Sequence, residues 1–153
     1  MNIERKLEEM GYPLPETPKP VAAYIPAIQS NEFVFTSGQI PVQNGDIKFK
    51  GKVGQVISVE EGYEAAKICA INALSAIKSV IGDLDKIEQI VKVVGFVNSA
   101  NDFTQQPAVI NGASEFLKEV FGNKGAHSRS AVGVAQLPLG VSVELEMIVK
   151  IKS

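Results

Sequence analysis

The segment between Ser58 and Gly82 most constrains the fold, because it predicts one long amphipathic helix. Ser58 and Glu61 have the spacing of a capping box, which begins a helix, and Gly82 suits its end. Between them, apolar side chains recur with the helical period: Ala65, Ala66, Ile68, Cys69, Leu74, Ile77, Val80 and Ile81. A helix with such an apolar face must pack on another layer of structure.

The other segments with regular periodicity or turn residues supply that layer. They are strands at 21–27 and 32–36 that form a hairpin, a short hairpin around Asn44-Gly45, a central strand at 87–97, a helix from Pro107 to Gly122, and strands at 128–136 and 141–151 that form a last hairpin. The order β, β, α, β, α, β, β predicts an α+β fold, in which a mixed sheet carries two helices on one face. The other face then needs a cover, which suggests contacts between subunits.

Length and composition set the class of protein. The 153 residues suit a single domain, 1–153, with an N-terminal arm at 1–20 in which Ile3, Leu7 and Met10 have helical spacing before a proline-rich stretch. The segment is expected to form a lid or an arm. A hydrophobic share of 45% and a mean hydropathy of +0.10 are high for a lone soluble domain, which again suggests an oligomer.

Charge and cysteine content bear on partners and compartment. A net charge of −2 gives no positive field for nucleic acid, so a nucleic-acid partner is not expected. The chain has no apolar run of about 18 residues, so no membrane partner is expected. The single cysteine, Cys69, suits a buried thiol in a reducing compartment, and the predicted location is cytoplasmic.

Arg129 is the residue whose setting is most unusual. It is one of two arginines and lies inside an apolar strand, where alternation puts it on one face with the small residues Ala131 and Gly133. If the last two strands pair as a hairpin with Gln136 opposite Val141, Glu144 and Glu146 share that face. Two interpretations follow: an ordinary ion pair with Glu146, or a pocket in which the guanidinium binds a carboxylate or phosphate.

Common catalytic and cofactor motifs are absent from the sequence. It has no P-loop, no GxGxxG, no nucleophile elbow and no HExxH, and no histidine or cysteine cluster with metal-ligand spacing. A zinc site is therefore not expected. His127, the only histidine, has no visible acid or nucleophile partner in the sequence, and by itself it indicates no function.

Three segments in the right order resemble one family, the RidA/YjgF reactive-intermediate deaminases, also known as endoribonuclease L-PSP or translation-inhibitor proteins. The segments are Thr36 to Pro41 (TSGQIP), Asn98 to Phe103 (NSANDF), and Arg129 to Pro138 followed by Val143 to Glu146 (VELE). The resemblance covers about residues 20 to 151. It implies a chorismate-mutase-like fold assembled as a homotrimeric barrel, with sites between subunits and no metal or organic cofactor.

The resemblance also implies a reaction and a set of site residues. The reaction is hydrolysis of enamine or imine intermediates of the 2-aminoacrylate type to 2-keto acids and ammonia. Arg129 would bind the substrate carboxylate, and Glu144 matches the glutamate thought to orient the attacking water. The other matching positions line the substrate pocket: Tyr24, Ser37, Gly38, Asn111 and Ala131.

Two departures from the family pattern separate this chain from the founding members. Ala131 stands where a cysteine commonly follows the Arg-Ser pair, and the arm and an insertion before Asn111 lengthen the chain. Two rival functions therefore remain beside the deaminase. One is a regulatory trimer that binds small carboxylates without turnover. The other, less favoured because of the net charge, is a ribonuclease or translation inhibitor.

Overall fold

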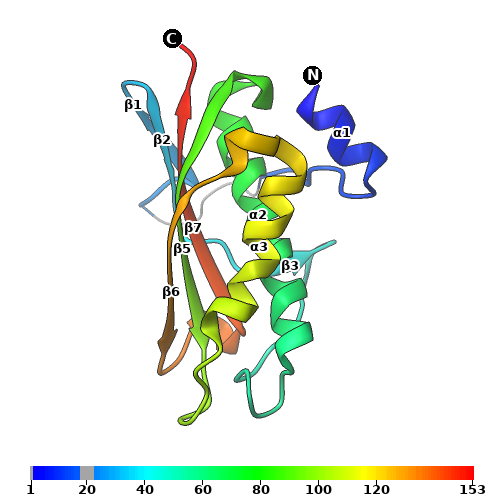
Figure 1. Ribbon diagram of the computed structural model, residues 1–153, viewed down its shortest axis with the longest axis vertical. Coiled ribbons are helices and arrows are strands. Elements are labelled where there is room, and N and C mark those ends of the chain that lie inside the picture. Colours follow the sequence, from blue (N-terminus) through cyan, green and yellow to red (C-terminus); the bar gives the residue numbers. More distant parts are fainter. Residues whose placement is uncertain (1, 18–22) are drawn as a thin grey trace.

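The computed structural model describes residues 2–17 and 23–153 (Figure 1). The helices are α1 (Ile3–Glu9), α2 (Val59–Ile81) and α3 (Gln106–Phe121), with short 3-10 helices η1 (Leu84–Lys86), η2 (Gly122–Gly125) and η3 (Pro138–Gly140). The strands are β1 (Ala27–Ser30), β2 (Phe33–Thr36), β3 (Val42–Gln43), β4 (Asp46–Ile47), β5 (Ile87–Asn98), β6 (Ser128–Val134) and β7 (Val143–Ile151).

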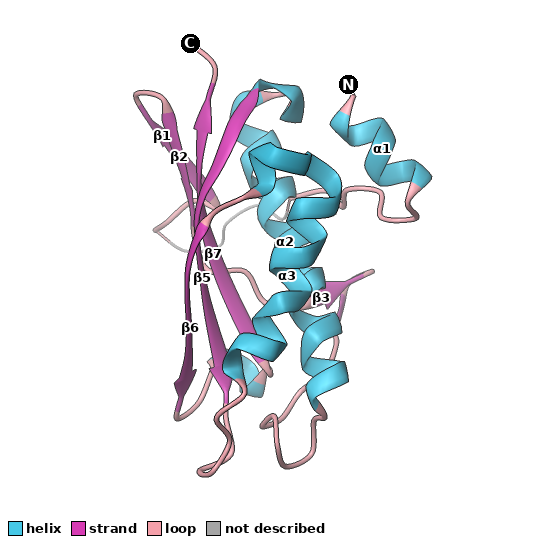
Figure 2. Ribbon diagram, in the orientation of Figure 1, coloured by secondary structure: helices cyan, strands magenta, loops and turns pink. Residues whose placement is uncertain are grey.

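Five strands form the main sheet, in the order β1-β2-β7-β5-β6. Only β5 and β6 run parallel to each other, and the other neighbours are antiparallel. Helices α2 and α3 lie together on one face of this sheet (Figure 2). Among the described residues no helix covers the opposite face, which is called the open face below. The predicted α+β class, with two helices on one face of a mixed sheet, is confirmed.

The core fills the space between the sheet and the two helices. Strand β7 shows how the sequence achieves this, because its residues alternate between two environments. Val143, Leu145, Met147 and Val149 are at most 1% exposed and point toward the helices. Glu144 and Glu146 point to the open face, so this strand can carry charge without placing it in the core.

Local signals predicted most elements correctly. The capping box of α2 is present, with Ser58 Oγ accepting from Glu61 N at 3.1 Å and the Glu61 carboxylate accepting from Ser58 N at 3.0 Å. Asn44 and Gly45 turn the β3–β4 hairpin with φ of +53° and +82°. The first strand is misplaced, since β1 covers Ala27–Ser30 rather than 21–27. Residues 23–26 are not strand, and residues 21–22 lie outside the described part.

The predicted C-terminal hairpin is wrong. Strand β6 pairs in parallel with β5, and β7 pairs with β5 on its other side and with β2. The connection between them passes through η3, where Leu139 and Gly140 both have positive φ. This connection carries the chain across β5 to its other edge, instead of turning it back along β6. The consequence for the site is described below.

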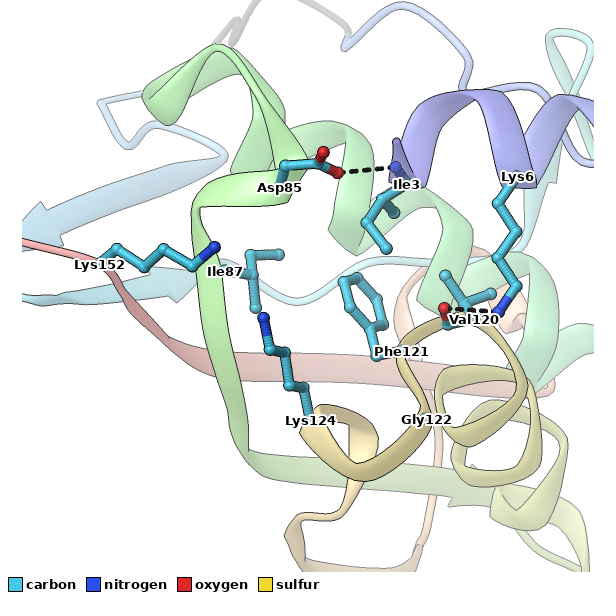
Figure 3. A pocket seen from close by; sticks show the side chains of 9 residues that line it. All are labelled: Ile3, Lys6, Asp85, Ile87, Val120, Phe121, Gly122, Lys124 and Lys152. Carbon is cyan, nitrogen blue, oxygen red and sulfur yellow. Dashed lines mark hydrogen bonds between the residues drawn. The ribbon is translucent and has the colours of Figure 1, made fainter. Parts of the chain in front are cut away.

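The N-terminal arm is built into the fold rather than resting on it as a lid. Leu7 of α1 is fully buried, and α1 docks against η1, β5 and the end of α3 (Figure 3). Ile3 N donates to Asp85 Oδ1 at 2.7 Å, and Lys6 Nζ donates to the carbonyl oxygen of Val120 at 3.0 Å. A cavity of about 260 Å³ remains at this seam. Residues 18–20 of the predicted arm lie outside the described part.

Candidate functional site

Arg129 lies on β6, which forms one edge of the sheet, and its Cα is paired with that of Val93. Paired residues of parallel strands point to the same face, and Val93 is fully buried beneath the helices. The Arg129 side chain therefore lies on the helix face. Ala131, paired with Gly95, shares this face and packs against the core, so the predicted alignment of Arg129 with Ala131 is confirmed.

Two side chains of α3 hold one end of the guanidinium. Nη1 of Arg129 donates to Asn111 Oδ1 at 2.8 Å and to Ser114 Oγ at 3.2 Å. Asn111 and Ser114 are three positions apart on α3 and therefore face the same way. The structure thus brings together Arg129 and Asn111, two of the residues singled out from the sequence.

The other end of the guanidinium is open. Among residues 2–17 and 23–153, Nε and Nη2 of Arg129 make no hydrogen bond, and the side chain forms no ion pair. The two bonds made by Nη1 use its two protons, which leaves the donors that fork onto a carboxylate. The interpretation of Arg129 as the ion-pair partner of Glu146 is wrong for a single chain.

Ser114 connects Arg129 to His127, a connection that the sequence reasoning missed. Ser114 Oγ lies 2.9 Å from His127 Nε2, and His127 Nδ1 lies 2.6 Å from the carbonyl oxygen of Gly125. The spacing carried a signal in retrospect. Ser114 follows Asn111 by three residues on a helix, and His127 precedes Arg129 by two residues along the chain, which is the spacing of side chains on one face of a strand.

A second group of predicted residues lies around Glu144. The backbone of Gly38 runs directly beside this carboxylate, so a Cβ at position 38 would overlap Glu144 Oε2. Gln39 continues the segment and pairs with Leu145 of β7, its N donating to the Leu145 carbonyl oxygen at 2.8 Å. Glycine is needed at 38 because the glutamate occupies the space that a side chain would fill.

Ser37 anchors the loop that carries the aromatic residue. Its hydroxyl donates to the carbonyl oxygen of Ile25 at 2.6 Å, and its backbone N donates to that of Pro26 at 2.7 Å. Tyr24 immediately precedes this anchored pair, and its side chain is 64% exposed. The structure therefore places Tyr24 near Ser37 and Gly38, with its ring uncovered in the single chain.

The electrostatic setting of Glu144 differs from that of an ordinary surface glutamate. Partial burial raises the pKa of its carboxyl group, and the negative charge of Glu146 raises it further. Both effects disfavour the ionised form. A carboxyl group with a raised pKa accepts a proton more readily than an ordinary glutamate, which suits a group that handles protons.

Arg129 and Glu144 do not share a face, contrary to the sequence-based expectation. Glu144 is paired with Phe96 and points to the open face, whereas Arg129 points to the helix face. The strand alternation was assigned correctly within each strand. The error came from the assumed hairpin, because pairing β6 with β7 would have aligned the two residues differently. The candidate residues of each chain therefore form two separate groups, one around Arg129 and one around Glu144, which are called the two half-sites below.

A cavity of about 510 Å³ opens beside Gly38, between the segment Gly38–Ile40, α2 and the arm. The arm is tied to α2 at this point, since Ser75 Oγ donates to the Pro15 carbonyl oxygen at 2.6 Å and Thr17 Oγ1 donates to that of Ser75 at 2.9 Å. Pro15 and Glu16 line the cavity. The arm thus borders the segment that begins at Gly38, on the side of the sheet that carries α2.

No group of three or more His, Cys, Asp or Glu side chains lies close enough to hold a metal ion within the part of the chain that the structure covers. No helix in that same part is long and apolar enough to cross a membrane.

The sequence matches one known protein family. A family model described as YjgF/chorismate mutase-like matches residues 4–149, and the chain therefore belongs to the YjgF/RidA family. The chain is 38% identical to protein TCP17 of Trypanosoma cruzi, covering 99% of this chain and 95% of that protein. It is 34% identical to 2-iminobutanoate/2-iminopropanoate deaminase of Salmonella typhimurium, covering 86% and 89% respectively.

Solved structures show the same relationship. A crystal structure of an Agrobacterium tumefaciens protein of unknown function is 42% identical, with a TM-score of 0.92, covering 98% of this chain and 92% of that one. The structure of E. coli TdcF with bound serine is 28% identical, with a TM-score of 0.62, covering 90% and 94%. The chorismate-mutase-like fold is therefore shown both by the family and by its solved members.

Proposed function

We propose that this protein is a cytoplasmic homotrimer that hydrolyses imines of small 2-amino acids to 2-keto acids and ammonia. The observation that carries the proposal is the open fork of Arg129. Asn111 and Ser114 hold Nη1, so Nε and Nη2 are oriented to bind a carboxylate, which is the group common to these substrates. The deaminase of Salmonella typhimurium and the serine-bound TdcF support a small amino-acid-like ligand.

The location of the two half-sites argues for assembly. Arg129 and Glu144 lie on opposite faces of one sheet, so a pocket that uses both needs a second chain. The open face exposes apolar side chains, with Ile28 56%, Phe35 40% and Val132 43% accessible. A neighbouring copy that covered this face would bury them and bring its own Arg129 edge toward Glu144. In this arrangement the exposed Tyr24 covers the substrate.

The proposed reaction needs only a positioned substrate and one carboxylate that transfers protons. Arg129 binds the carboxylate and fixes the imine carbon, while Glu144 holds a water molecule against it. The water oxygen bonds to the carbon as the C=N π electrons move to nitrogen, and Glu144 takes one water proton and passes it to that nitrogen. In the tetrahedral intermediate Glu144 then takes the hydroxyl proton and passes it to the amine nitrogen. The O–H electron pair forms the C=O bond as the C–N bond breaks and ammonia leaves. The raised pKa of Glu144 suits this proton transfer.

The second candidate is a trimer that binds carboxylates without turning them over. It is favoured by one observation: the Arg129 half-site is complete within a single chain and owes nothing to Glu144. Ala131 also leaves no thiol beside Arg129, whereas the family commonly has a cysteine there. A catalytic assay separates the two functions.

The deciding assay generates 2-iminopropionate in situ and follows its loss with catalytic amounts of protein. We expect wild type to accelerate the loss, Arg129→Ala to abolish the acceleration, and Glu144→Gln to reduce it strongly. Binding of 2-oxobutanoate should be lost in Arg129→Ala and kept in Glu144→Gln. Binding without any acceleration by wild type would establish the second candidate, and the absence of both would reject the assignment of Arg129.

Subunit mixing tests whether the half-sites meet between chains. Trimers of Arg129→Ala chains alone should be inactive, and trimers of Glu144→Gln chains alone should be strongly impaired. A co-assembled mixture contains contacts in which an intact Arg129 meets an intact Glu144. We expect an equal mixture to regain activity at about a quarter of its sites. Light scattering should give a trimer for each variant. Trimers that regain no activity after co-refolding would contradict a shared site.

A further inference from the structure

We infer that His127 and Ser114 form a positioning pair that sets the orientation of the Arg129 guanidinium. The inference rests on the proposed function only in the identity of the ligand, a carboxylate. It starts from a chain of three contacts, which runs from the Gly125 carbonyl through the His127 ring and the Ser114 hydroxyl to Arg129 Nη1.

The first contact fixes the tautomer of the ring. A carbonyl oxygen can only accept, so the 2.6 Å contact with Gly125 requires a proton on His127 Nδ1. In the neutral ring Nε2 is then bare and can only accept. The hydroxyl of Ser114, 2.9 Å away, must therefore donate its proton to Nε2.

The direction of the Ser114 proton decides what the hydroxyl can do for the arginine. With its proton on His127, the oxygen presents its lone pairs toward Arg129, and Nη1 donates to it at 3.2 Å. A serine in the middle of a helix otherwise tends to turn its hydroxyl back onto a backbone carbonyl of the previous turn. The histidine thus keeps Ser114 available as an acceptor, and Ser114 with Asn111 keeps Nη1 away from the ligand side.

The surroundings of the ring agree with this role. His127 forms no ion pair among the described residues. The ionisable side chains on the elements that pack around it are Glu115, Lys118 and Glu119 on α3, Lys124 in η2, Glu88 and Lys92 on β5, and Arg129 itself. Glu88 pairs with Lys150. Glu115 is engaged by the Tyr63 hydroxyl, and Lys92 pairs with Ser128 and points to the open face.

The first test is spectroscopic and needs no ligand. His127 is the only histidine, so its ring nitrogens give one unambiguous set of signals in a ¹⁵N-labelled full-length protein. We expect the neutral ring to carry its proton on Nδ1, with Nε2 bare. A ring protonated on Nε2 would overturn the inference directly, whatever the protein's function is.

The second test measures binding of 2-oxobutanoate by calorimetry in variants that separate the contacts. Ser114→Ala should raise the Kd about three- to tenfold, as expected for one lost hydrogen bond, with Ser79→Ala on α2 as the control. Ser114→Thr keeps the hydroxyl and should restore most of the affinity. His127→Asn keeps a donor where Nδ1 stands but removes the acceptor, and should match Ser114→Ala.

A double variant tests whether His127 acts through Ser114. If His127 acts through Ser114, His127→Asn with Ser114→Ala should weaken binding no more than Ser114→Ala alone. Additive losses, or unchanged binding in Ser114→Ala while Arg129→Ala abolishes it, would overturn the positioning pair and leave the proposed function intact. Absence of 2-oxobutanoate binding by wild type would instead reject the proposed function and the role of the pair in it.

Discussion

Arg129 Nη1 lies 2.8 Å from Asn111 Oδ1, and this bond joins the edge strand β6 to helix α3 across the helix face of the sheet. The bond orients the guanidinium without neutralising it, because an amide oxygen carries no net charge. No carboxylate of the described residues pairs with Arg129, so a carboxylate of the proposed ligand would be the first full negative charge to bind it.

Replacing Asn111 by aspartate tests this distinction. The change keeps the shape of the side chain but puts a carboxylate on Arg129, which should then compete with the ligand. We expect the Kd of 2-oxobutanoate to rise about 10- to 100-fold, as for a charge-assisted bond of about 1.5–3 kcal/mol. Calorimetry measures the Kd, and Asn101→Asp at an exposed position controls for net charge. Equal binding by Asn111→Asp and wild type would contradict the role of Arg129.

Gly38→Ala should separate activity from stability. The new Cβ would overlap the Glu144 carboxylate, which is the far end of a flexible side chain and can move aside. We expect the melting temperature to change little, since the backbone need not shift, while the imine hydrolysis rate falls at least tenfold through the displaced carboxylate. Thermal melting and the 2-iminopropionate assay measure the two effects. A rate equal to wild type would show that the position of this carboxylate is unimportant.

The pH dependence of the imine hydrolysis rate should follow the ionisation of Glu144. Burial and the charge of Glu146 raise its pKa, so the carboxylate needed as base is lost at a higher pH than for an ordinary glutamate. Glu146→Gln removes one of the two causes. We expect the acid limb of the kcat/KM profile to move to lower pH in this variant. A limb that stays in place, measured in the same buffers, would mean that another group controls it.

The free energy of unfolding should depend on pH through the ionisation of Tyr63. Its hydroxyl donates to the Glu115 carboxylate between α2 and α3, and this bond, with burial and the charge of Glu115, raises its pKa to about 12. The bond needs the protonated hydroxyl, so its contribution is fully present below about pH 10 and is lost as the pH rises through about 12. Tyr63→Phe should lower the free energy of unfolding by about 0.5–1 kcal/mol at pH 8, a low value because solvent reaches the pair.

Two measurements check the Tyr63 prediction. Denaturant unfolding at pH 8 gives the stability difference, and alkaline titration of tyrosine absorbance should lose its step near pH 12 in the variant. A variant that keeps this late step would assign it to another tyrosine.

The elements were predictable from the sequence where their signals are local. Ser58 and Glu61 cap α2 within a single turn, and Asn44-Gly45 adopts the positive φ angles of a tight hairpin turn. Pro107 lies in the first turn of α3, as its missing N–H allows. Each of these signals depends on neighbours a few residues away, so no tertiary information was needed.

The pairing of β6 depends on the whole sheet and could not be found in the same way. Leu139 and Gly140 form a compact turn in either arrangement, and only the packing of β5 between its neighbours decides which strand β6 joins. The error placed Glu144 on the same face as Arg129 in one chain. Ser114 and His127 were missed because their partner atoms lie on different elements, and a single histidine has no pattern to recognise.

The open edge of β6 has a consequence for the newly made chain. A strand edge offers unpaired backbone groups to any other strand, which makes it a place where misassembly can begin. Strand β6 exposes Ser128 and Ser130 on the same face as Val132, so its surface is largely polar although its backbone remains available. This composition disfavours indiscriminate aggregation at low chain concentration. The edge of β6 can therefore stay soluble while it remains free to pair with a strand of matching shape.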